Sequence, residues 1–272
     1  MKAKCRSLFT AVVLVLFFGP VGMALGYSSI VSLGDSLSDN GNVGRFTDGP
    51  LWVELLADHY AAPLVDIAYG GATTGYDNPA AGLTFTGLQW QVEQLASLPA
   101  DSLIPVWAGV NDLLQLRSPS DAVANIDLAL ENLYLAGGRN FIVPNLPNIG
   151  STPSLVLDPV ASQAATFWTL AFNASFEGTL QDFDNRHTDV DLFFVDVFTI
   201  FEQYPVGTPE WQELFWLDGF HPSSVGHQRI FEAALATIEP VPEPATVLLL
   251  GTGIIGIIGS RLRHRKKLYP IS

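Results

Sequence analysis

Short apolar runs alternate with longer helical patterns along most of this chain. The runs, rich in Val, Ile, Leu and Phe, lie at residues 30–33, 64–68, 103–108, 141–143 and 192–195. The helical patterns occupy residues 51–60, 88–98, 121–135, 161–183 and 225–238. Such alternation is typical of a parallel sheet with helices on both faces. We therefore expect one α/β domain with a central five-stranded parallel sheet, in which Ser120 caps the third helix and Gly137 and Gly138 end it.

Polar residues that could carry chemistry follow the first three strands. Ligands of parallel sheets bind outside the carboxyl ends of the strands, so these positions face the expected site. The segment Gly-Asp-Ser-Leu-Ser-Asp-Asn-Gly-Asn at 34–42 places Ser36 on a turn, where its hydroxyl could act as a nucleophile. The second strand leads to Gly70 and Gly71, and a glycine lets a backbone N–H approach a substrate oxygen closely. The third leads to Asn111, a neutral side-chain donor.

A fourth segment, Asp-Gly-Phe-His-Pro-Ser at 218–223, precedes the last helix. Asp218 lies three residues before His221 across a glycine, so its carboxylate can curl back onto one ring nitrogen of the histidine. The other ring nitrogen is then available to accept the serine proton. Together these residue types predict an acyl-transfer site.

The four segments, in this order and at these strand ends, resemble blocks I, II, III and V of the GDSL or SGNH hydrolases. The resemblance covers about residues 28–238 and implies a three-layer α/β/α, flavodoxin-like SGNH hydrolase fold. Within the family, the extended first segment is similar to plant GDSL esterases and to bacterial lecithinase or haemolysin-like lipases. The resemblance implies Ser36 as nucleophile, His221 as general base and then acid, and Asp218 as the residue that orients the histidine.

The resemblance also implies an oxyanion hole, made by the backbone N–H groups of Ser36 and Gly71 and by the side chain of Asn111. Spacing alone leaves open whether Gly70 or Gly71 donates. No metal or cofactor is expected in this chemistry.

Other residues compete for a functional role. His227 lies only six residues after His221, but within the last helical pattern, and His59 and His187 are expected on the surface. A cluster of aspartates could suggest a calcium site, but it lacks the glycine and the glutamate that a calcium loop needs at its characteristic spacing. We therefore expect a solvated acidic surface at Asp182, Asp184, Asp189 and Asp191. Four tryptophans could stack on sugars or pack in the core: Trp90, Trp168, Trp211 and Trp216.

Charge excludes one class of partner. Between residues 27 and 240 the chain has five arginines, no lysine and 26 acids, a formal charge of −21. Such a surface repels phosphate backbones and anionic lipid, so no nucleic-acid partner is expected. The one cysteine, Cys5, lies outside this stretch, which therefore has neither a disulfide nor a thiolate metal site.

Both ends of the chain carry targeting features. Lys2, Lys4 and Arg6 precede an apolar run at 8–19 and small residues at 24–26, which predicts a signal peptide at 1–26. A Pro-Glu-Pro segment at 242–244 opens 16 uncharged residues that end in an Arg/Lys cluster. Residues 241–272 resemble a PEP-CTERM sorting signal. The resemblance implies a transient anchor in the inner membrane by a C-terminal helix, an exosortase-type processing enzyme as partner, and a final place in the cell envelope or outside the cell. A plain C-terminal anchor is the alternative.

The sequence therefore predicts an exported serine hydrolase, with its catalytic domain at 27–240. It would cleave carboxylic esters of lipids, polysaccharides or small alcohols through an acyl-enzyme on Ser36. A non-catalytic envelope protein that keeps the scaffold for binding is one alternative. A phosphatase using Asp35 or Asp39 is another, weakened by the lack of a lysine to hold phosphate.

Overall fold

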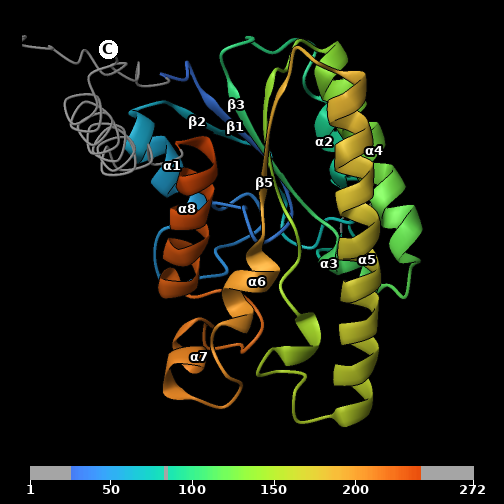
Figure 1. The fold of residues 1–272 in the computed structure, drawn as a ribbon, viewed down its shortest axis with the longest axis vertical. Helices are drawn as coiled ribbons and strands as arrows, with labels where there is room; N and C mark the ends of the chain where they lie inside the picture. Colours follow the sequence, from blue (N-terminus) through green and yellow to red (C-terminus); the bar gives the residue numbers. More distant parts are fainter. Residues whose placement is uncertain (1–25, 83–84, 240–272) are drawn as a thin grey trace, which may run out of the picture.

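The computed structural model describes residues 26–82 and 85–239 (Figure 1). The expected signal peptide, apart from its last residue, and the expected sorting signal at 241–272 lie outside the described residues.

Five parallel strands form the central sheet, as predicted. In chain order they are β1 (Ile30–Gly34), β2 (Leu64–Asp66), β3 (Leu103–Trp107), β4 (Asn140–Pro144) and β5 (Asp191–Val195). Their order in space is β2-β1-β3-β4-β5, and every neighbouring pair is parallel. The middle strand β3 and its neighbour β1 are buried at every residue, which explains why both are mostly apolar.

Helices cover both faces of the sheet. On one face α1 (Trp52–Tyr60) packs against α8 (Ser224–Ile238); on the other lie α2 (Leu88–Glu93), α4 (Pro119–Leu135) and α5 (Pro159–Arg186) (Figure 1). The remaining short helices lie in the connections that follow strands: α3 (Val110–Leu114), η1 (Ile149–Ser151), α6 (Val197–Glu202) and α7 (Pro209–Glu213). The three layers share one apolar core, in which the rings of Trp52 and Trp107 meet edge to face at 5.7 Å.

The helix boundaries correct three expectations. The cap of α4 is Ser118, not Ser120: its hydroxyl accepts from the N–H of Asp121 at 3.3 Å, and Pro119 takes the first helical position. Proline fits there because that N–H has no partner within the helix. The helix ends at Leu135, and Gly137 follows with a φ of +110°, as expected of a glycine stop.

The other two corrections concern length. The second helix stops at Glu93 instead of running to 98, and the N–H of Leu98 bonds to the carbonyl of Ala136. The fourth begins at Pro159, two residues earlier than expected, because Asp158 accepts from two N–H groups of its first turn.

Candidate active site

A tight turn after β1 carries Ser36. A Cβ atom at Gly34 would lie 2.0 Å from the carbonyl oxygen of Trp107, so only glycine fits where β1 passes β3. The next residue, Asp35, fixes the turn: its carbonyl accepts from the N–H groups of Ser38 and Asp39, both at 3.1 Å. The turn places the hydroxyl of Ser36 in a cleft at the carboxyl end of the sheet.

The loop between α7 and α8 brings Asp218 and His221 to the same cleft. Gly219, with a φ of +69°, lets the loop curl, and one carboxylate oxygen of Asp218 accepts from the N–H groups of Phe220 and His221 at 2.9 and 3.0 Å. The other carboxylate oxygen lies 2.5 Å from Nδ1 of His221, and Nε2 of the same ring lies 2.9 Å from Oγ of Ser36. The three predicted residues thus form one hydrogen-bonded chain.

The surroundings of His221 hold its ring and favour an ionised partner. Phe46 stacks on the imidazole at 4.9 Å between ring centroids, and Phe220 meets it edge-on at 5.3 Å. Burial opposes the ionisation of Asp218, but the hydrogen bonds from His221 and from two backbone N–H groups outweigh it and lower the pKa of Asp218. The carboxylate therefore stays charged beside the imidazole.

Backbone N–H groups without acceptors lie beside Ser36. Among the described residues, the N–H groups of Ser36 and Gly71 make no hydrogen bond. The N–H of Gly70, in contrast, donates to the buried carboxylate of Asp39 at 2.6 Å. Nδ2 of Asn111 lies 3.0 Å from the carbonyl oxygen of Ala72. Of the two glycines that spacing could not separate, Gly71 is the one with an uncommitted donor.

The cleft itself has a volume of about 230 Å³. Apolar side chains from four segments form its walls, whereas the polar groups lie together around Ser36: the walls include Val43, Phe46, Ala80, Ala81, Leu114 and Phe220. A reactive hydroxyl, an imidazole and unpaired N–H groups in an apolar cleft suit the attack of an oxygen nucleophile on an acyl group.

Buried carboxylates support the site from behind. Burial raises the pKa of Asp35 to about 7, although the N–H of Leu37 and the side chain of Asn111 donate to it. Burial likewise raises the pKa of Asp112, which accepts from the N–H and hydroxyl of Thr74 at 2.9 Å. Neither Asp35 nor Asp39, the residues of the phosphatase hypothesis, lines the cleft. The sequence does not indicate a role for Asp112, because its contact with Thr74 joins residues 38 positions apart in the chain.

The competing histidines lie elsewhere. His227 is buried on α8, where its Nδ1 accepts from the N–H of Trp52 at 3.4 Å, and burial lowers its pKa to about 3. His59 is exposed, as expected. His187 is half-buried, less exposed than expected: its ring packs on Tyr134 at 4.0 Å between ring centroids and forms a hydrogen bond with Glu131.

The four aspartates of the calcium alternative do not converge. Within residues 26–82 and 85–239, no three His, Cys, Asp or Glu side chains gather as a metal site would require. One of the four, Asp189, pairs with Arg139 at 3.0 Å. None of the four tryptophans is fully exposed: Trp211 is buried, and Trp90, Trp168 and Trp216 are half-buried. Trp168 stacks on Phe172 at 5.4 Å between ring centroids.

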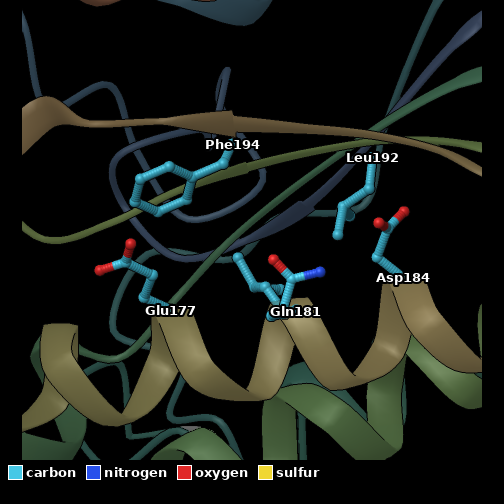
Figure 2. A pocket seen from close by; sticks show the side chains of 6 residues that line it. Glu177, Gln181, Asp184, Leu192 and Phe194 are labelled. Carbon is cyan, nitrogen blue, oxygen red and sulfur yellow. The ribbon is translucent and has the colours of Figure 1, made fainter.

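A second hollow of about 230 Å³ lies between α5 and β5, away from Ser36. Figure 2 shows Glu177, Gln181 and Asp184 of the helix facing Leu192 and Phe194 of the strand across this α5–β5 groove. Over the part of the chain that the structure describes, these three polar side chains make no hydrogen bond.

Among the helices of residues 26–82 and 85–239, none combines the length and the apolar composition that a membrane-spanning helix needs.

Two family models match the chain. One, described as GDSL-like Lipase/Acylhydrolase, matches residues 30–234, and one described as a PEP-CTERM protein-sorting motif matches residues 240–266. The second match overlaps the sorting segment expected at 241–272.

Several curated proteins are related to the same region. A phosphatidylcholine-sterol acyltransferase from Aeromonas hydrophila is 28% identical over 172 residues, covering 51% of this chain and 50% of the relative. A thermolabile hemolysin from Vibrio parahaemolyticus is 30% identical over 154 residues, covering 46% of this chain and 35% of the relative. The chain thus matches half or less of the length of these relatives.

Solved structures share the fold. A member of the lipolytic protein G-D-S-L family from Veillonella parvula aligns with a TM-score of 0.52 at 18% identity, covering 78% of this chain and 99% of that one. A phospholipase A1 from Streptomyces albidoflavus aligns with a TM-score of 0.51 at 16% identity, covering 77% and 98%. The layers are those of the SGNH hydrolase fold, and the chain belongs to the GDSL-like lipase/acylhydrolase family.

Proposed function

We propose that this protein is an exported serine hydrolase that cleaves carboxylic esters through an acyl-enzyme on Ser36. The observation that carries the proposal is the hydrogen-bonded chain from Asp218 through His221 to Ser36, with distances of 2.5 and 2.9 Å, in an apolar cleft. The lipase/acylhydrolase family and the relative named acyltransferase support an acyl ester as the substrate class.

In the first half-reaction, Nε2 of His221 takes the proton of Ser36 as Oγ attacks the ester carbonyl. The carbonyl oxygen becomes an oxyanion and accepts from the N–H groups of Ser36 and Gly71. The amide of Asn111 would exchange one present acceptor for the same oxygen. His221 then gives its proton to the departing alcohol, which leaves the acyl group on Ser36.

In the second half-reaction, a water molecule gives its proton to His221 and attacks the acyl carbon. Collapse of the second tetrahedral intermediate breaks the bond to Oγ, which recovers the proton from the imidazole. Asp218 stays ionised throughout and stabilises the imidazolium that forms twice in each cycle.

The ends of the chain support an envelope location. A signal peptide at 1–26 would direct export, and a C-terminal helix after the Pro-Glu-Pro motif would hold the domain outside the inner membrane, since the basic cluster stays on the cytoplasmic side. An exosortase-type enzyme would then process the chain near residues 242–244. A C-terminal tag that stayed on the membrane-bound, full-length protein in its native host would contradict this processing step.

The direct test of the catalytic proposal is labelling of the protein by a fluorophosphonate probe, with the modified residue located by mass spectrometry. We expect modification of Ser36, and no labelling of the Ser36→Ala variant. A folded protein that does not react would instead favour the alternative of a non-catalytic binding protein on the same scaffold.

A further inference from the structure

One phenylalanine contacts both the proposed catalytic base and the segment beside the proposed oxyanion donors. Phe46 lies in the β1–α1 loop (residues 35–51) and stacks on the imidazole of His221, with 4.9 Å between ring centroids and 30° between ring planes. The same ring lies against Gly70: a Cβ atom there would be 2.8 Å from Cζ of Phe46 and closer still to Cε2. All three residues line the cleft. Phe46 therefore bridges two segments that each contribute a group to the proposed reaction.

The contact with Phe46 explains why residue 70 is a glycine. The N–H of Gly70 is committed to Asp39 at 2.6 Å, so it does not serve a substrate oxygen. Its φ is negative, unlike the +85° of Gly71, so backbone conformation alone would admit other residues. Space does not admit them, because the ring of Phe46 occupies the position that a side chain would take. The two neighbouring glycines thus have different roles.

Hydrogen bonds hold the β1–α1 loop on both sides of Phe46. Before it, the buried carboxylate of Asp39 accepts from three N–H groups of the loop at 2.6–3.0 Å, as well as from that of Gly70. After it, the carboxylate of Asp48 accepts from the N–H of Ser224, the first residue of α8, at 2.7 Å. The loop is therefore tied both to the segment of Gly70 and to the helix that follows the catalytic histidine.

The proposed reaction needs the base and the oxyanion donors at a fixed spacing. Nε2 of His221 must reach first Oγ of Ser36 and then the oxygen of the departing alcohol, while the N–H of Gly71 holds the carbonyl oxygen. The hydrogen bonds that His221 makes with Asp218 and Ser36 act in the plane of the imidazole. Phe46 packs against the face of the ring and limits tilting out of that plane. The position of the base relative to the oxyanion donors therefore depends on where Phe46 lies.

We propose that Phe46 is a positioning residue of the active site. Packed on Gly70, it holds the imidazole of His221 in line with Ser36 and sets the spacing between the base and the oxyanion donors. The role of Gly70 is then to make room for this ring, in contrast to the donor role of Gly71. This inference rests on the proposed ester hydrolysis.

The test uses three variants of the full chain and a matched control. Phe46→Leu removes the ring but keeps an apolar side chain, Gly70→Ala places a methyl group where the ring lies, and the double variant has the methyl group without the ring. Phe167→Leu, at an α5 residue that is 63% exposed and outside the cleft, is the control. For each protein we would measure kcat and KM with p-nitrophenyl acetate and the rate at which a fluorophosphonate probe labels Ser36. Urea unfolding checks that each variant is folded.

We expect Phe46→Leu to lower kcat and the labelling rate about tenfold with KM within twofold, because the reacting groups remain but are misplaced. Gly70→Ala should lose at least as much, since its methyl group displaces the ring that packs on the imidazole. The double variant should be no slower than Phe46→Leu alone, because the methyl group then meets no ring. The control should match the unmodified chain.

A raised KM with an unchanged kcat in Phe46→Leu would overturn the inference, since Phe46 would then serve only as a wall of the cleft. Losses that multiply in the double variant would also overturn it, because Gly70 would then act independently of Phe46. If Gly70→Ala does not fold, the kinetics of Phe46→Leu still decide between these roles. All of these outcomes leave the proposed function standing, whereas an unmodified chain that neither hydrolyses the ester nor reacts with the probe would end both.

Discussion

The cleft and the α5–β5 groove have the same volume, about 230 Å³, yet they differ in how their polar groups are held. In the cleft, His221 is fixed between Asp218 and Ser36 by hydrogen bonds and between two phenylalanine rings. In the groove, carboxylate and amide side chains face an apolar strand with no partner among the described residues (Figure 2). Catalysis depends on groups that are already in place before the reaction, and size alone does not supply them.

The sharpest test of this comparison removes the nucleophile. Ser36→Ala should lower kcat/KM for p-nitrophenyl acetate by about 10⁴-fold or more, because the attacking oxygen is lost while the cleft stays intact. Initial rates with purified protein measure the loss, and a circular dichroism spectrum checks the fold. Activity within tenfold of the unmodified chain would show that another group attacks the ester.

A smaller loss is expected when the side-chain donor of the proposed oxyanion hole is removed. Asn111→Ala should reduce kcat by about 10²–10³-fold with little change in KM, since that hydrogen bond matters most in the transition state. Steady-state kinetics separate the two parameters. A raised KM with an unchanged kcat would instead place Asn111 in substrate binding.

His227, which is buried on α8, allows a test through the pH dependence of the free energy of unfolding. Burial lowers the pKa of His227 to about 3, so the folded state resists a proton that the unfolded chain binds below about pH 6.5. Its contribution to the free energy of unfolding should therefore decline as the pH falls below 6.5, by at most about 1.4 kcal/mol per pH unit.

Asp35 contributes a pH dependence of the free energy of unfolding with the opposite sign. With a pKa raised to about 7, its folded carboxyl keeps a proton that the unfolded chain loses above about pH 4, so its contribution declines as the pH rises between these values. The variant His227→Gln should remove only the first effect. Urea unfolding at pH 5.5 and 7.5, with the exposed His59→Gln as control, should show that His227→Gln loses less stability than the control on acidification. Equal losses in the two variants would contradict the assignment.

The smallest effect is expected in the α5–β5 groove. Glu177→Gln combined with Asp184→Asn should change kcat/KM by less than about twofold, because surface substitutions away from special features are nearly neutral. The same p-nitrophenyl acetate assay measures it. A large loss would mean that the groove communicates with the site, and the contrast between the two hollows would fail.

The sequence predicted the parallel sheet and the residues around Ser36 because both follow from local patterns. Apolar runs mark strands buried on both faces, and polar residues just after parallel strands must meet at one edge. It could not predict that the N–H of Gly70 donates a hydrogen bond to Asp39, or that Phe46 stacks on His221. These contacts join residues far apart in the chain, and only the folded backbone brings them together.

The cap of α4 differs from the predicted one for another reason. Ser118 and Ser120 are both acceptable caps by residue type, and Pro119 decides between them through its fixed φ. A proline directly after a candidate cap residue favours the first helical position, and so identifies the serine before it as the cap.

The nucleophile and its base come from opposite ends of the domain, 185 residues apart along the chain. A chain emerging from a translocation channel would present Ser36 early but gain its histidine only when the loop before α8 has followed. The proposed hydrolytic activity would thus be withheld during biosynthesis, and a prematurely ended product that lacked this loop would also lack the proposed base.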